Sequence, residues 1–265
     1  MWDCPDFLGV PARSCKPRDR GLTHVLDKGL PVDALEALLG QTGHLVDVLK
    51  VGWGILYIDP TAKQRVALCQ AAGVTLSLGG TLLEIAVACG RVAALSRWAG
   101  DLGVSAVEVS DGLERLHGSA KTDLVRSLSR DFMVLAETGA KDGHSPVVAA
   151  QWLAEMEADL DAGASWVIAE GRESGTVGLY DESGRVNESL VAAIADRIPL
   201  DRVIFEAPRK DQQTWFIENL GPDTNLGNIA TGEILPLETL RLGLRADTAH
   251  LLCDAAALAA AGRAR

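Results

Sequence analysis

Short apolar runs recur along the chain at a nearly regular spacing. Each is long enough for a buried strand and too short for a helix. The runs cover residues 22–26, 46–51, 74–78, 106–109, 132–136, 166–169, 203–205 and 226–230. Most are separated by segments whose apolar residues have helical spacing, such as Leu35, Leu38 and Leu39. Strands that alternate with helices predict an α/β protein, and at about 30 residues per unit they predict a (β/α)8 TIM barrel.

Proline and glycine positions support these helices. Pro31 and Pro146 stand where first helical turns are expected, and Gly103 and Gly163 stand where helices end before a strand. An open doubly wound sheet is the rival architecture. We favour the barrel because no Gly-x-Gly-x-x-Gly motif follows the first strand and because polar clusters follow almost every strand.

The first 20 residues differ from the rest of the chain. They contain three prolines and no periodic pattern, so we expect residues 1–20 to form an N-terminal arm on the surface of the barrel. No low-complexity or Ser/Pro-rich linker divides the remainder. The sequence therefore predicts a single domain, the barrel of residues 21–265, preceded by the arm.

Charged and polar residues gather directly after the predicted strands. The clearest case is the strand 166–169, which is followed by Glu-Gly-Arg-Glu-Ser-Gly-Thr at 170–176. By itself, this segment is equally typical of an ordinary strand-to-helix loop with solvated charges. Similar clusters after nearly every other strand favour a reaction site, since the carboxyl ends of barrel strands converge on one face.

Acidic residues close or follow nearly every predicted strand. Carboxylates that crowd together repel one another, and burial adds a desolvation penalty to each. A bound divalent cation offsets both effects, and Mg²⁺ suits a site of oxygen ligands without Cys or clustered His. The candidate metal ligands are Asp27, Glu108, Asp111, Glu170 and Glu206, with Glu137 in the same pool.

Several basic residues also fall at strand ends, although the chain is acidic overall. Positive charge at the mouth of a barrel attracts a small anionic substrate, because salt screens the rest of the protein beyond about 8–10 Å. Gly79, Gly80 and Thr81 suit a helix N-terminus that binds phosphate or carboxylate, or a simple turn. Our substrate-binding candidates are Lys28, Gly80, Thr81, Arg172, Ser174, Arg209, Lys210 and Asn228.

The composition narrows the choice of partners and compartment. The formal net charge of −11 disfavours nucleic acid and anionic membranes as partners, because both require a basic face. The five cysteines are scattered and form no Cys-x-x-Cys pair, so we expect a reduced, cytoplasmic protein. We identify no secretory signal and no run of about 18 apolar residues that would span a membrane. The Ala-rich segment 251–261 favours a homo-oligomer.

Several strings of residues occur in the order and at the spacing of a known family. They cover 16–18, 21–23, 25–30, 79–82, 107–112, 170–175, 203–208 and 240–245, together with Lys50 and the Gly-Trp-Gly of 52–54. By these strings the chain, from Lys16 to Thr248, resembles the phosphosulfolactate synthase family, whose members add sulfite to phosphoenolpyruvate. The resemblance implies a (β/α)8 barrel, dependence on Mg²⁺, and the product phosphosulfolactate, an early intermediate of coenzyme M synthesis in archaea and a source of sulfolactate in some bacteria.

The resemblance also implies roles for single residues. Lys141 matches a family lysine after the fifth strand and is our candidate acid for the proton that C2 receives; the alternative is a solvated loop lysine. Lys50 and Glu137 are the other catalytic candidates. Sulfite attack at C3 puts negative charge on the substrate carboxylate, which Mg²⁺ and neighbouring Lys and Arg would stabilise as an aci-carboxylate. From the residues themselves, we expect Arg172, Arg209 and Lys210 to clamp phosphate or sulfonate; the alternative for each is an interface salt bridge.

The chain departs from the family at one place. Where the family usually continues Gly-Trp-Gly with Thr-Ser, this sequence has Ile55-Leu56. The two hydroxyls either contact the substrate or nucleophile, in which case one of these differs here, or only cap the following helix.

Three functions therefore stay open. The first is sulfite addition, or a variant that adds another nucleophile to an enol phosphate. The second is a Schiff-base aldolase that uses Lys50 or Lys141. The third is a non-catalytic protein of the heat-stress type on the same scaffold.

Two further residues lie near the predicted strand ends. Trp53 is a candidate wall of the site, since it follows the second strand. His24 lies in the first strand close to Asp27, and we interpret it as a core or strand-end histidine rather than as a base.

Overall fold

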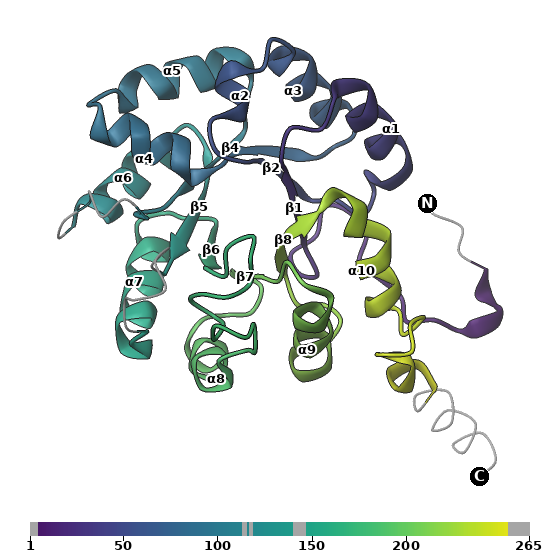
Figure 1. Cartoon of the computed structure of the whole chain (residues 1–265). Helices are drawn as coiled ribbons and strands as arrows, with labels where there is room; N and C mark the ends of the chain where they lie inside the picture. Colours follow the sequence, from purple (N-terminus) through teal and green to yellow (C-terminus); the bar gives the residue numbers. More distant parts are fainter. Residues whose placement is uncertain (1–4, 113–115, 117–118, 140–146, 254–265) are drawn as a thin grey trace.

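The protein folds into a closed barrel of eight parallel strands in the order β1 to β8 (Figure 1). The structure is a computed structural model, which describes residues 5–112, 116, 119–139 and 147–253. The strands are β1 Thr23–Asp27, β2 Val48–Val51, β3 Thr75–Leu78, β4 Ala106–Val109, β5 Met133–Thr138, β6 Trp166–Ala169, β7 Val203–Glu206 and β8 Leu226–Ala230. The predicted (β/α)8 fold is thus confirmed, and each apolar run of the sequence overlaps one strand.

Helices surround the barrel and connect consecutive strands (Figure 1). The α-helices are α1 Val32–Thr42, α2 Ile55–Ile58, α3 Ala62–Ala71, α4 Gly80–Ala88, α5 Val92–Leu102, α6 Ala120–Leu128, α7 Ala149–Asp161, α8 Glu188–Arg197, α9 Lys210–Leu220 and α10 Ile234–Arg241. Short 3-10 helices cover η1 Asp6–Leu8 and η2 Thr231–Glu233. Pro31 directly precedes α1, and Gly103 ends α5 with a φ of 83°, as the sequence predicts. Pro146, expected in a first helical turn, lies outside the described residues.

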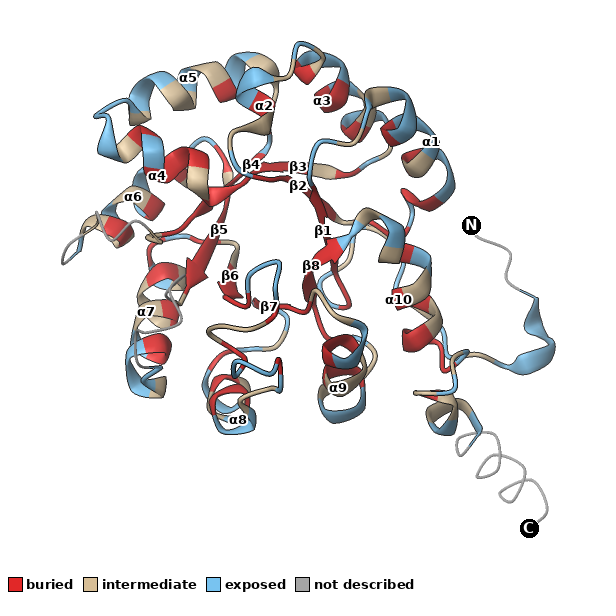
Figure 2. Cartoon of the chain, in the orientation of Figure 1, coloured by how far each residue is buried: buried red, intermediate tan, exposed pale blue. Residues whose placement is uncertain are grey.

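Two apolar layers hold the fold together. The larger lies between the strands and the helices, and Figure 2 shows the strands buried and the helices exposed on their outer sides. The smaller contains Leu22, Val48, Ala106, Leu135, Ile168 and Ile204. Because side chains alternate between the two faces of a strand, these residues share the inner face of the barrel. They fill the amino-terminal half of the barrel interior. The polar groups farther along each strand therefore lie above an apolar layer, the floor of the barrel interior.

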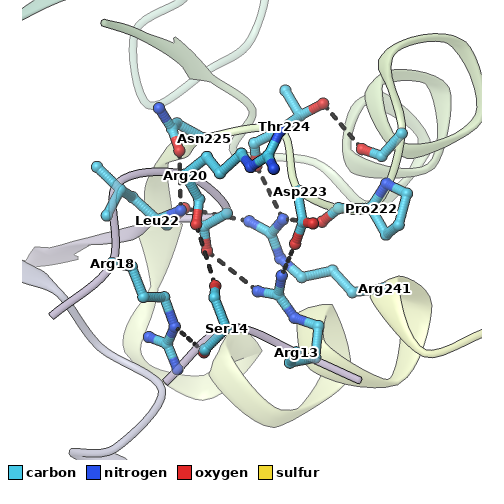
Figure 3. A network of polar contacts seen from close by, with 12 residues as sticks. Arg13, Ser14, Arg18, Arg20, Leu22, Pro222, Asp223, Thr224, Asn225 and Arg241 are labelled. Carbon is cyan, nitrogen blue, oxygen red and sulfur yellow. Dashed lines mark hydrogen bonds and ion pairs between the residues drawn. The ribbon is translucent and has the colours of Figure 1, made fainter. Parts of the chain in front are cut away.

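Arg241, the last residue of α10, closes the amino-terminal end of the barrel. Its buried guanidinium donates hydrogen bonds to the carbonyl oxygens of Leu22 (3.1 Å), Thr224 (2.8 Å) and Pro222 (Figure 3). Burial, together with the charge of nearby Arg13, lowers the pKa of Arg241 to about 9. The group therefore remains charged at neutral pH and ties α10 to the starts of β1 and β8.

The segment that precedes β1 packs against the same end. Arg13 donates a 3.0 Å hydrogen bond to Glu238 of α10. It donates another to Asp223 (Figure 3). Arg18 binds both carboxylate oxygens of Asp47, at 3.0 and 3.1 Å, just before β2. These contacts lie at the amino-terminal end of the barrel, opposite to the carboxyl ends of the strands. The division into an arm of residues 1–20 and a barrel of residues 21–265 stays a prediction.

Candidate active site

Five charged side chains reach the same pocket because of the two-residue period of the strands. Each follows an inward-facing apolar residue by two positions, as Lys50 follows Val48 and Glu108 follows Ala106. The five are Lys50, Glu108, Glu137, Glu170 and Glu206. They come from β2, β4, β5 and β7 and from the residue directly after β6. The register of the barrel thus places a charged layer directly above the apolar floor.

The pocket opens at the carboxyl ends of the strands, as predicted for a barrel of this kind. Its empty volume is about 550 Å³, including the opening to solvent. Besides the charged layer, it is lined by Gly80 and Thr81 from the start of α4, by Arg172 and by Asn228. Nine of the predicted site residues therefore lie together. Their chemical roles stay predictions.

Lys50 is the charged centre of the pocket. Its Nζ lies 3.2 Å from Glu108 Oε1 and 3.1 Å from Glu206 Oε1. Burial by itself lowers the pKa of Lys50, but the surrounding carboxylates outweigh it and hold the pKa above its ordinary value. A Schiff-base lysine must lose its proton before it attacks a carbonyl. The geometry therefore disfavours an aldolase that uses Lys50.

Glu206 and Glu108 are fixed by backbone groups as well as by Lys50. Glu206 Oε2 accepts hydrogen bonds from the N–H groups of Gly171 (3.0 Å) and Arg172 (2.9 Å). Glu108 Oε2 accepts one from the N–H of Gly80 at 3.2 Å. Although burial raises the pKa of Glu108, Lys50 and His24 hold it below its ordinary value. These contacts orient both carboxylates, and they favour the ionised form of Glu108.

Gly80 is required where α4 approaches β4. A Cβ at this position would lie 2.2 Å from Oγ of Ser110. Only glycine allows the N–H of residue 80 to come so close to Glu108. This N–H is thus occupied by Glu108, so Thr81 is the part of the Gly79-Gly80-Thr81 segment that remains a candidate for substrate contact.

Glu170 differs from the other carboxylates of the pocket. Burial, followed by the charges of Glu137 and Glu206, raises its pKa well above the ordinary value. Its Oε1 accepts a 2.6 Å hydrogen bond from the N–H of Arg172, whereas its buried Oε2 accepts none from the described residues. In the absence of a further cation, these effects therefore favour the protonated form of Glu170.

Asp27 requires a correction as a predicted metal ligand. It is buried, but it does not line the pocket. Its Oδ1 accepts hydrogen bonds from the N–H groups of Gly29 (2.9 Å) and Leu30 (2.8 Å), and its Oδ2 accepts one from Arg65 (2.6 Å). Both oxygens are committed to the loop after β1, so Asp27 has a structural role.

Other predicted site residues also lie outside the pocket lining. Lys210 pairs with Asp247 at 2.8 Å on the surface. Arg209 donates a 3.3 Å hydrogen bond to the carbonyl oxygen of Ser183. The remaining residues of this group are Lys28, which is exposed, Ser174, which is hydrogen-bonded to Thr176, and Asp111, which accepts the N–H of Leu116. For these five residues, a position near the end of a strand did not bring the side chain into the pocket lining. Lys141 lies outside the described residues.

Two residues near the pocket were not among the predicted site residues. Glu173 lines it next to Arg172. His24 is buried with its Nε2 3.1 Å from Glu108 Oε1. The available signal was its place between the inward-facing Leu22 and Leu26. Trp53, the candidate wall, does line the pocket and has a left-handed backbone with a φ of 52°.

The departure at Ile55-Leu56 does not reach the pocket. Leu56 is buried in the core between the strands and the helices, and Ile55 packs against that core. Neither lines the pocket. The helix α2 begins at Ile55 without a side-chain cap.

A substitution tests this assignment of Leu56. We expect Leu56→Ser to lower the free energy of unfolding by about 2–5 kcal/mol, because it removes buried apolar atoms and buries a hydroxyl. The KM for an anionic substrate should stay unchanged. Denaturant unfolding and steady-state kinetics measure the two effects, with Ile58→Ser as the control, since Ile58 is 78% exposed on the same helix. A large rise in KM at unchanged stability would contradict the assignment.

Two kinds of feature are absent from the described residues. No three His, Cys, Asp or Glu side chains are grouped there as a ready-made metal site. In the same parts of the chain, no helix has both the length and the apolar character needed to cross a membrane.

The fold and the pocket together have the architecture of a (β/α)8-barrel enzyme, with charged groups at the carboxyl-terminal face. The model of the family described as (2R)-phospho-3-sulfolactate synthase (ComA) matches residues 11–247. The chain therefore belongs to the phosphosulfolactate synthase family.

Curated relatives agree with the family match over nearly their whole length. A phosphosulfolactate synthase of Methanothermobacter thermautotrophicus is 42% identical over 249 residues, which cover 92% of this chain and 96% of the relative. One of Bacillus subtilis is 36% identical and covers 93% of this chain and 99% of the relative. Among solved structures, a 3-hexulose-6-phosphate synthase superposes with a TM-score of 0.54 at 13% identity, over 83% of this chain and 98% of the other. That likeness shows the fold alone.

Proposed function

We propose that the protein adds sulfite to C3 of phosphoenolpyruvate and forms phosphosulfolactate. The observation that carries the proposal is the buried Lys50, held charged among carboxylates in a pocket of the region that the family model matches. The relatives named phosphosulfolactate synthase support the choice of substrates. Small anions are also the ligands that Lys50 and Arg172 would attract.

The charge balance of the pocket supports a divalent cation. Five glutamates line the pocket with one lysine and one arginine, and the proposed substrates add further negative charge. Glu108 and Glu206 are engaged by Lys50 and by backbone N–H groups. We therefore propose that Glu137 and Glu170 hold Mg²⁺, because Glu170 Oε2 accepts no hydrogen bond from the described residues. One or two carboxylates suffice, since substrate oxygens and water complete the usual Mg²⁺ shell.

The residues of the pocket would stabilise charge and bind the substrate during sulfite addition. As the sulfite sulfur bonds to C3, the π electrons of the double bond move toward the substrate carboxylate, where negative charge develops. Mg²⁺, when bound, would supply positive charge at those oxygens. Lys50 is already oriented by Glu108 and Glu206, so it would stabilise the same charge without rearrangement. Arg172 and the start of α4 at Thr81 would bind the phosphate.

The reaction is completed when C2 takes up a proton and the carboxylate regains its ordinary charge. Lys141 is our candidate for the acid. It lies outside the described residues, in the connection that follows β5, the strand that brings Glu137 to the pocket. A lysine that delivers this proton must have a pKa lowered toward neutrality, which nearby cations would provide.

Incubation with phosphoenolpyruvate, sulfite and Mg²⁺ tests the proposal. We expect loss of the enol absorbance and an adduct by mass spectrometry, and we expect a chelator to abolish both. Thiosulfate and small thiols in place of sulfite would identify a different nucleophile. Trapping by borohydride would identify an aldolase. Saturable binding of phosphoenolpyruvate without any product would favour a non-catalytic member of the family and refute the proposal.

Mg²⁺ binding has a readout that does not depend on turnover. We expect Mg²⁺ without substrate to raise the Tm of the protein, by about 5–10 °C at a hundredfold excess over Kd. Glu170→Gln should lose this rise, because it removes one of the proposed ligands. Glu182→Gln is the matched control, since Glu182 is exposed outside the pocket. Differential scanning calorimetry with and without chelator measures the shift, and a full rise in Glu170→Gln would contradict the ligand assignment.

A further inference from the structure

His24 lies directly behind the charged layer, on the inner face of β1. It is fully buried, and its Nε2 is 3.1 Å from Glu108 Oε1. On the other side of the ring, the backbone N–H of Asn228 in β8 donates a 3.5 Å hydrogen bond to Nδ1. The imidazole thus bridges the first, fourth and eighth strands at the level of the pocket.

The backbone of β8 is shaped to receive this ring. A Cβ at residue 227 would lie 2.9 Å from Ile204 and 3.1 Å from His24 Nδ1, so glycine provides the space that the imidazole occupies. The next residue, Asn228, has a left-handed backbone with a φ of 53°. Such a φ is uncommon for a residue other than glycine. With this backbone conformation, the N–H of Asn228 points at His24 and the Asn228 side chain lines the pocket.

These contacts define which nitrogen of His24 carries the proton. Because Nδ1 accepts a hydrogen bond, it has no proton, and in the neutral ring the proton is then on Nε2. Nε2 lies 3.1 Å from Glu108 Oε1 without the full alignment of a hydrogen bond, and neither atom has a hydrogen-bond partner elsewhere among the described residues. The proton on Nε2 is therefore available to Glu108.

We propose that His24 is a positioning residue of the active site. Its Nε2–H holds the Glu108 carboxylate, whose Oε1 also lies 3.2 Å from Lys50 and whose Oε2 accepts the N–H of Gly80. With contacts at both oxygens, the carboxylate cannot rotate, and the Lys50 ammonium keeps its direction into the pocket. The inference deepens the proposed function and rests on it, because the Lys50 charge is what sulfite addition would use.

Two substitutions separate this role from simple packing. The side-chain amide nitrogen of glutamine reaches about as far as Nε2, so His24→Gln can still donate to Glu108. The asparagine side chain reaches only as far as Nδ1, so His24→Asn keeps a partner for the Asn228 N–H and loses the donor. We expect His24→Asn to lower kcat about tenfold or more, with a smaller effect on KM, and His24→Gln to recover most of the loss.

Controls keep the comparison interpretable. His250→Asn changes an exposed histidine near Glu218 and should behave as the wild type. Thermal unfolding should be similar for His24→Asn and His24→Gln, because both replace the ring by a smaller amide. Equal losses of kcat in the two variants at equal stability would overturn the proposal, as would wild-type kcat in His24→Asn.

Nuclear magnetic resonance gives a readout that does not require turnover. In protein labelled with ¹⁵N at histidine, the His24 signals are assigned by their absence from His24→Asn. We expect Nε2 to carry a proton, and a ring protonated at Nδ1 alone would overturn the proposal. A wild-type protein that fails to add sulfite would refute the proposed function, whereas the tautomer would still decide the contact with Glu108.

Discussion

Lys50→Met is expected to lower kcat for sulfite addition by about 10²–10³-fold, the largest effect of any single substitution in the pocket. The substitution removes the positive charge that would stabilise the developing carboxylate charge. It also leaves Glu108 and Glu206, both within 3.2 Å of Nζ, without their counter-ion in a buried layer. We therefore expect a second effect, a loss of about 3–5 kcal/mol in the free energy of unfolding.

Steady-state kinetics and denaturant unfolding of Lys50→Met measure the two effects separately. Lys63→Met is the matched control, because Lys63 is exposed on α3; it should leave both quantities unchanged. Lys50→Arg keeps the charge and tests whether the position of the ammonium matters. Turnover close to that of the wild type in a folded Lys50→Met would remove Lys50 from the mechanism.

Arg65→Met is expected to have the largest effect on stability outside the pocket. The guanidinium contacts Asp27 at 2.6 Å and Asp59 at 2.9 Å, and Asp27 is fully buried. Removing the cation leaves the Asp27 charge without its partner, which costs about 3–5 kcal/mol and lowers the Tm by roughly 10 °C. At temperatures where the variant stays folded, its affinity for Mg²⁺ should equal that of the wild type.

The control for Arg65→Met is an ion pair at the surface. Arg185→Met breaks the contact with Asp181, which is solvent-exposed, and should leave the free energy of unfolding nearly unchanged. Calorimetry measures stability, and titration with Mg²⁺ measures the affinity. A variant Arg65→Met that keeps its stability but binds Mg²⁺ more weakly would show that Asp27 is a metal ligand after all.

The fold was predictable because its signal is carried by local periodicity. Buried strands of a parallel barrel appear as short apolar runs, and the covering helices show their own spacing. The charged layer follows the same rule, since Lys50, Glu108 and Glu206 each occur two residues after an inward apolar residue. A period of two therefore predicts both the floor of the pocket and the polar groups above it.

The roles of the loop residues were not predictable in the same way. Arg209 and Lys210 lie three and four residues after the end of β7, yet their side chains contact Ser183 and Asp247 rather than the pocket. After the last residue of a strand, the direction of a side chain depends on loop geometry, which has no fixed period. The engagement of Asp27 by Arg65 could not be predicted either, because the two residues are 38 positions apart in the sequence.

The isotopic composition of the product tests the proposed sulfite addition most directly. The protein is incubated with phosphoenolpyruvate, sulfite and Mg²⁺ in D₂O, and the product is analysed by mass spectrometry with fragmentation. Sulfite addition at C3 followed by protonation at C2 predicts one compound that keeps the phosphate, carries sulfonate at C3 and has gained a single deuterium at C2. Release of inorganic phosphate, or the absence of any compound that contains both phosphorus and sulfur, would contradict it.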